Sequence, residues 1–103
     1  MSNMANLMRQ AQQMQKKMAE VQKGLKEKTC EAASGGGMVT ATVSGDLRLV
    51  SLKIDKTVVN PEDVEMLEDL VLAAVNEGYK RAQDMAAEEM GKVTKGLGIP
   101  GLF

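Results

Sequence analysis

A single stretch decides the fold of this chain: Met4-Ala-Asn-Leu-Met-Arg-Gln-Ala-Gln-Gln-Met-Gln-Lys-Lys-Met-Ala-Glu-Val-Gln-Lys-Gly-Leu25. Its apolar residues recur at alternating steps of three and four, which is the a/d pattern of a coiled-coil seam. The pattern predicts a helix that ends between Lys26 and Thr29. Its apolar side is expected to pack against the protein's own core or against a helix of another chain. The seam consists of Met4, Leu7, Ala11, Met14, Met18, Val21 and Leu25.

The opposite side of this helix is basic. Arg9, Lys16 and Lys23 all occupy position f, so they form a row spaced about 10.5 Å at 1.5 Å rise per residue. Residues 1–30 hold six bases and only two acids, which leaves most of this charge without a local partner. Such a face is either the solvated surface of a coiled coil or a surface that binds a polyanion.

The chain as a whole is not basic. Its 103 residues include 13 Lys and Arg against 14 Asp and Glu, a formal net charge of −1. This balance excludes a globally basic nucleic-acid binder and predicts a polarised molecule, because residues 61–90 carry nine acids and two bases. DNA is expected to approach the end or face that keeps this acidic segment at a distance. The length suits one domain.

Residue types that are missing exclude several functions. Cys30 is the only cysteine and there is no histidine, so disulfide, Cys-His and imidazole-based catalytic or metal sites cannot be built. We therefore expect no enzyme activity, cofactor, metal or small-molecule substrate. No apolar run approaches the roughly 18 residues of a membrane span, which predicts a cytoplasmic protein without a membrane partner. Tyr79 and Phe103 are the only aromatic residues, so little ring area can be buried and the hydrophobic core must be small. A core of this size favours a homodimer, in which a second chain covers apolar surface.

The middle of the chain predicts a small antiparallel sheet. A short strand is expected over Thr29–Ala33, followed by a tight turn at the glycines of Ser34–Gly37. Apolar and polar residues then alternate over Met38–Ser44 and again over Leu47–Asp55, which predicts a hairpin with one apolar face covered by a helix.

A second long helix is expected after the sheet. Asn60 is a suitable N-cap and Pro61 suits the first helical position. The apolar residues are dense up to Gly78 and sparser beyond it, so the first half is expected to cover the sheet and the second half to meet the first helix. Two pairs on this helix have the i,i+4 spacing of an ion pair: Glu77 with Arg81, and Glu88 with Lys92. Because these glutamates would neutralise Arg81 and Lys92, the two cations are weaker candidates for DNA contacts.

The last segment has a different composition. Three glycines and Pro100 in residues 96–103 are incompatible with a helix, so this Gly/Pro-rich tail is set apart from a single domain over residues 1–95. The tail is either a flexible end or an apolar ribbon that docks on a neighbouring surface.

Several segments together resemble the YbaB/EbfC family of bacterial nucleoid-associated proteins. They are Asn6-Leu-Met-Arg-Gln-Ala-Gln-Gln-Met-Gln-Lys-Lys-Met18, Gly35-Gly-Gly-Met-Val39, Lys53-Ile-Asp55, Glu65-Met-Leu-Glu-Asp-Leu70 and Leu97-Gly-Ile-Pro-Gly-Leu-Phe103. The resemblance implies an α+β fold of order α-β-β-β-α, forming a tweezer-like homodimer. Its small antiparallel sheets would lie at the centre, and its two long projecting helices would bind double-stranded DNA.

The resemblance also implies which residues bind DNA. Arg9, Lys16 and Lys17 lie in the matching first segment, and the heptad pattern adds Lys23. The expected function is therefore that of a non-catalytic, homodimeric DNA-binding protein of the bacterial nucleoid. The alternative is a coiled-coil adaptor that grips a helix of a partner protein through its methionine-rich seam.

Overall fold

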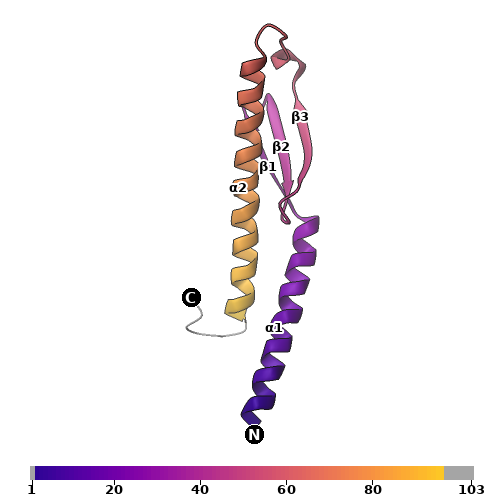
Figure 1. Cartoon of the computed structure of the whole chain (residues 1–103), viewed down its shortest axis with the longest axis vertical. Helices are drawn as coiled ribbons and strands as arrows, with labels where there is room; N and C mark the ends of the chain where they lie inside the picture. Colours follow the sequence, from indigo (N-terminus) through magenta and orange to yellow (C-terminus); the bar gives the residue numbers. More distant parts are fainter. Residues whose placement is uncertain (1, 97–103) are drawn as a thin grey trace.

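The computed structural model describes residues 2–96, and the chain is elongated, measuring 74 × 23 × 16 Å along its principal axes. The sheet and the first half of the second helix lie at one end, and the first helix projects from it (Figure 1). This arrangement confirms the α+β fold class, whereas residues 97–103 of the predicted tail lie outside the described residues. The elements are α1 (Ser2–Glu27), β1 (Thr29–Ser34), β2 (Val39–Ser44), β3 (Leu49–Ile54), the short 3-10 helix η1 (Lys56–Val58) and α2 (Val64–Gly96).

The three strands form one antiparallel sheet in the order β1-β2-β3. β1 pairs with β2 from Thr29 opposite Ser44 to Ser34 opposite Val39. The glycines between them all adopt positive φ angles, 58° at Gly35, 69° at Gly36 and 96° at Gly37. Glycine adopts such angles without the steric cost of a β-carbon, and the predicted tight turn is confirmed.

The alternation predicted over Leu47–Asp55 is interrupted near the start of the third strand. Ile54 and Leu52 lie opposite Val39 and Ala41, but the register shifts after Thr42, so that Leu49 rather than Val50 lies opposite Val43. A β-bulge with one extra residue explains this shift. It follows the turn in which Leu47 has a φ of 64°, and the strand starts at Leu49, two residues later than predicted.

α2 covers β1 and β2 at close range. One cluster of the core consists of Val39, Ala41 and Ala74, with Val58, Leu70, Val71 and Val75 packed against it. These small side chains let the helix approach the sheet, and Gly78 is placed at the closest point. A β-carbon at Gly78 would lie 2.9 Å from Cγ2 of Val43, so the absence of a side chain there is a packing requirement.

α2 begins later than the sequence predicted. The side chain of Asp63 accepts a hydrogen bond from the backbone N–H of Met66 at 3.1 Å, which makes Asp63 the N-cap of a helix that starts at Val64. Asn60 instead accepts from the N–H of Glu62, and the N–H of Asp63 donates to the carbonyl of Asn60. The predicted cap and Pro61 therefore belong to a turn before the helix, because two capping residues compete and the later one prevails.

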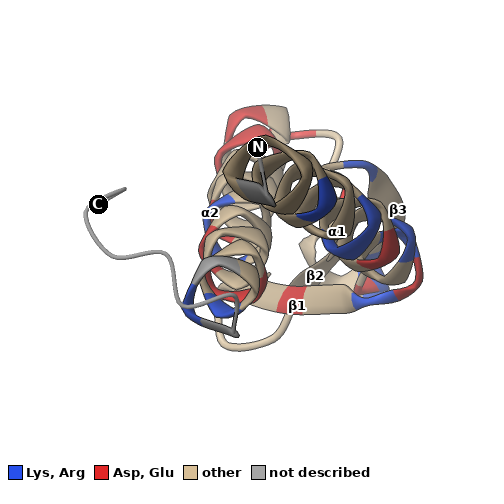
Figure 2. Ribbon diagram, turned by 90° about the horizontal axis from the view of Figure 1, so that it is seen from below, with Lys and Arg blue, Asp and Glu red and all other residues tan. Residues whose placement is uncertain are grey.

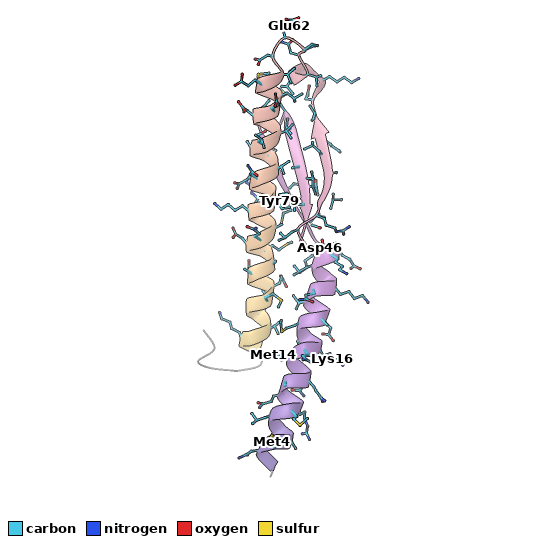
Figure 3. The ribbon with its side chains drawn as sticks, viewed as in Figure 1. Met4, Met14, Lys16, Asp46, Glu62 and Tyr79 are labelled. Carbon is cyan, nitrogen blue, oxygen red and sulfur yellow. The ribbon has the colours of Figure 1, made fainter. Side chains whose placement is uncertain are left out.

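The second half of α2 packs on the C-terminal half of α1, as predicted. Leu25 is buried, while Met14, Met18 and Val21 of the seam are half-buried. The end of α1 is seated on the turn after β2, where a β-carbon at Gly45 would lie 2.6 Å from the carbonyl oxygen of Leu25. α1 continues past the end of α2, which lies about level with Met14 (Figure 3).

Candidate nucleic-acid interface

The basic side of α1 is open to solvent. Arg9, Lys16, Lys17 and Lys23 are all exposed. The lysine and arginine positions of α1 lie on the side turned away from α2 (Figure 2). Lys16 and Met14 lie on opposite sides of the helix (Figure 3), as expected for residues about 200° apart around its axis. The structure thus places the predicted cations on one projecting arm.

None of these four cations forms an ion pair within residues 2–96. Lys26 shares this property: it is exposed, also without an ion pair there, and one turn beyond Lys23. The sequence prediction did not include it among the binding residues. Its i+3 spacing from Lys23 is the signal that could have found it, since residues three apart are neighbours on a helix surface.

Two arginines outside α1 are paired instead. Arg48 binds Asp46 at 2.9 Å, and Arg81 binds Glu77 at 3.3 Å. Arg81 also donates a 2.8 Å hydrogen bond from its guanidinium to the carbonyl of Glu31, which fastens α2 to β1. The predicted Glu77–Arg81 pair is confirmed.

The predicted pair of Glu88 with Lys92 is wrong. Lys92 binds Glu89 at 3.3 Å, and the same carboxylate oxygen binds Lys28 at 3.3 Å. Hydrogen bonds from Lys28 and then from Lys92 hold the pKa of Glu89 below its ordinary value. Glu89 is preferred to Glu88 because it faces the junction between α1 and β1, where a second cation is available.

The two ends of the molecule differ in charge. Glu62 lies at the sheet end, far along the molecule from Lys16 and Met4 on α1 (Figure 3). The acid-rich first half of α2 belongs to the sheet end, and the cations of α1 face away from α2. A polyanion is therefore attracted to the arm and repelled by the sheet end.

The described residues show no group of three or more His, Cys, Asp or Glu side chains that could hold a metal ion. Cys30 is half-buried, and its thiol donates to the thioether of Met85 at 3.6 Å, consistent with a packing role. Within the described part of the chain, no helix is long and apolar enough to cross a membrane.

Residues 1–97 match the model of a family described as the YbaB/EbfC DNA-binding family. The chain belongs to this family. Among its relatives, a nucleoid-associated protein of Alkaliphilus metalliredigens is 54% identical over 101 residues, 98% of this chain and 89% of the relative. A nucleoid-associated protein of Syntrophobacter fumaroxidans is 53% identical over 102 residues, 99% of this chain and 93% of the relative.

A solved structure supports the fold of this YbaB/EbfC chain. The crystal structure of uncharacterized protein HP0035 from Helicobacter pylori matches it with a TM-score of 0.64 and 31% sequence identity. The match covers 73% of this chain and 87% of the Helicobacter protein. The resemblance inferred from the sequence is thereby confirmed at the level of family and fold, and the individual DNA-binding residues remain predictions.

Proposed function

We propose that this chain is a nucleoid-associated protein that binds double-stranded DNA as a homodimer, through the basic side of α1 and without a catalytic step. The observation that carries the proposal is the row of exposed cations Arg9, Lys16 and Lys23, which form no ion pair with residues 2–96, on a helix that projects from the sheet. Membership of a DNA-binding family and relatives named nucleoid-associated proteins support it.

The row suits contacts with phosphates rather than with bases. Its cations are spaced about 10.5 Å along the helix, while duplex DNA carries one charge per about 1.7 Å of its axis, so several phosphates lie within reach of each side chain. Phosphate contacts set orientation and affinity but carry no sequence information. We therefore expect modest affinity and weak sequence preference.

A homodimer is supported by apolar surface that one chain leaves uncovered. All six residues of β3 are exposed, although Leu49, Leu52 and Ile54 share the face on which Val43, Ala41 and Val39 are buried. β3 is also an edge strand, whose unpaired backbone groups favour association. A second copy that covers this face would bring the two sheets to the centre and leave two α1 arms projecting.

Light scattering over a range of protein concentrations tests the dimer. A dimer mass at tens of micromolar and a melting temperature that falls on dilution are expected, because the folded state is then linked to association. A monomer mass with a concentration-independent melting temperature would contradict it.

A salt titration of binding to duplex DNA tests the mode of contact. Four predicted bases per arm, of which half reach phosphates, give about four contacts per dimer and a slope of log K against log salt near −3 to −4. A single strand of the same sequence serves as the competitor that distinguishes duplex from single-strand binding. Duplex affinity that does not change with salt would contradict the mechanism.

An adaptor that grips a partner's helix is the second candidate function. It is favoured by the apolar seam of α1 beyond α2, where Met4 and Leu7 are 68% and 61% exposed. The two functions make opposite predictions in the same titration, since an adaptor retains no DNA at any salt concentration.

A further inference from the structure

The seam of α1 changes its environment part-way along the helix. Met14 and Met18 are half-buried beside α2, whereas Met4, Leu7 and Met8 are 68%, 61% and 60% exposed. Ala11 is exposed as well. These four residues have the i, i+3, i+4, i+7 spacing of one continuous apolar patch, which we term the arm patch. Contiguous exposed apolar surface of this kind usually has an occupant.

The end of α2 lies close to the level at which the arm patch begins. α1 and α2 run antiparallel, and α2 ends at Gly96, about level with Met14 (Figure 3). Where the described residues end, the axis of α2 therefore runs toward the level of the N-terminal half of α1 (Figure 1). The sequence that follows has no charged residue, and four of its residues are large and apolar: Leu97, Ile99, Leu102 and Phe103.

We propose that residues 97–103 of the same chain cover the arm patch as an extended ribbon. The glycines and Pro100 prevent α2 from continuing, so the segment is suited to an extended path. At about 3.3 Å per residue it spans up to roughly 23 Å. The patch from Met14 to Met4 occupies only about 15 Å of helix at 1.5 Å per residue. The ribbon is therefore long enough to bring Leu102 and Phe103 onto Leu7 and Met4.

Tethering favours this occupant over a second chain. A segment joined directly to the neighbouring helix has an effective concentration on the order of millimolar, far above that of a free partner at micromolar concentration. The ribbon also leaves the basic side free, because Arg9 lies about 200° around the helix from Leu7. Covering the patch is thus compatible with binding of a polyanion by the same arm, and the inference does not depend on the proposed function.

Disulfide trapping tests where the segment lies. In a Cys30→Ser background, Leu7→Cys combined with Leu102→Cys should form an intrachain disulfide at least ten times faster than Arg9→Cys combined with Leu102→Cys. Both pairs have similar sequence separation, but only Leu7 belongs to the arm patch. Equal rates, or bonds formed only between chains, would overturn the proposal. So would rapid disulfide dimerisation of the Leu7→Cys variant in the same background, because it assigns the patch to α1 of a second copy.

Hydrogen exchange of the full-length protein provides a second measurement without engineered cysteines. Leu102→Ser combined with Phe103→Ser should speed exchange of the backbone amides between Leu7 and Met14 by about five-fold or more, because the cover of the helix is lost. Val59→Ser, which removes an exposed apolar side chain near the sheet, is the matched control and should leave these amides unchanged. Unchanged exchange in the tail variant would overturn the proposal.

Discussion

The two long helices differ in charge and in what their cations contact, because α1 has more bases than acids and α2 has more acids than bases. On α2, Arg81 and Lys92 are held by Glu77 and Glu89, and Arg81 also fastens the helix to the sheet. On α1, the row of Arg9, Lys16 and Lys23 meets no carboxylate within the described residues. The difference shows that only the packed structure reveals which of the described cations stay available to a partner.

The largest effect of a substitution on stability is expected where α2 contacts the sheet. Gly78→Ala would place a β-carbon 2.9 Å from Cγ2 of Val43, which is fully buried and has no room to move. Overpacking of this kind should lower the free energy of unfolding by about 2 to 3 kcal/mol. Chemical denaturation measures it.

Gly24→Ala is the matched control on α1. A β-carbon at Gly24 meets no atom within 4 Å, so the better helix propensity of alanine should raise stability by about 0.5 to 1 kcal/mol. If both variants change stability by the same amount and sign, the close contact that distinguishes α2 from α1 is not the determinant of its packing.

A smaller effect is expected where the two helices meet. Met14→Ala combined with Met18→Ala removes two half-buried side chains and should cost about 1 to 3 kcal/mol in total, less than the same change at fully buried sites. The arm should loosen while every cation is retained. Gln12→Ala combined with Gln15→Ala, both on exposed positions of the same helix, should leave the denaturation midpoint unchanged or slightly raised.

The third effect separates charge from packing. Arg9→Gln, Lys16→Gln and Lys23→Gln together should weaken duplex binding about ten-fold at moderate salt and flatten its salt dependence, because phosphate contacts are lost. Stability should change by less than about 0.5 kcal/mol, since glutamine has nearly the same helix propensity. Fluorescence anisotropy with labelled duplex DNA measures the affinity.

The control for this variant removes the same charge elsewhere. Lys53→Gln, Lys56→Gln and Lys80→Gln change exposed cations of β3, η1 and α2. They should weaken DNA binding far less than the α1 triple variant. If both triples bind equally weakly, net charge rather than the α1 row controls affinity; if the α1 triple binds like the parent, its cations only keep the helix soluble.

The smallest effect concerns the carboxylate between the two helices. The lowered folded-state pKa of Glu89 means that its contribution to stability is present above its ordinary value of 4.5 and is lost as pH falls through the folded-state value. Glu89→Gln should therefore melt slightly below the parent at pH 7, and the difference should shrink as the pH falls below 4.5. Glu88→Gln is the neighbouring control and should track the parent throughout. If the difference in melting temperature between Glu89→Gln and the parent stays constant with pH, the ion pairs of Glu89 do not cause it.

Much of this fold was predictable because its signals are local. The seam from Met14 to Leu25, the glycine turn after Ser34 and the alternation over Val39–Ser44 each follow from spacing along a few residues, and all three are confirmed. The start of α2 and the bulge in β3 were predicted incorrectly. Asn60 and Asp63 compete as the cap of α2, and one extra residue in β3 shifts the regular alternation, so that Leu49 lies opposite Val43.

By itself, the sequence determined the order of elements, the family and the presence of a basic side on the first helix, because periodicity and charge spacing are properties of one helix or strand. Only the tertiary structure decided which cations are left without ion pairs and which apolar residues are left uncovered. Glu89 meets Lys28 across 61 positions of the chain, and Leu52 stays exposed beside buried Ala41 because α2 covers only the neighbouring strands. Ion pairing and burial depend on where separate elements meet in space, and this cannot be predicted from the pattern within one helix or strand.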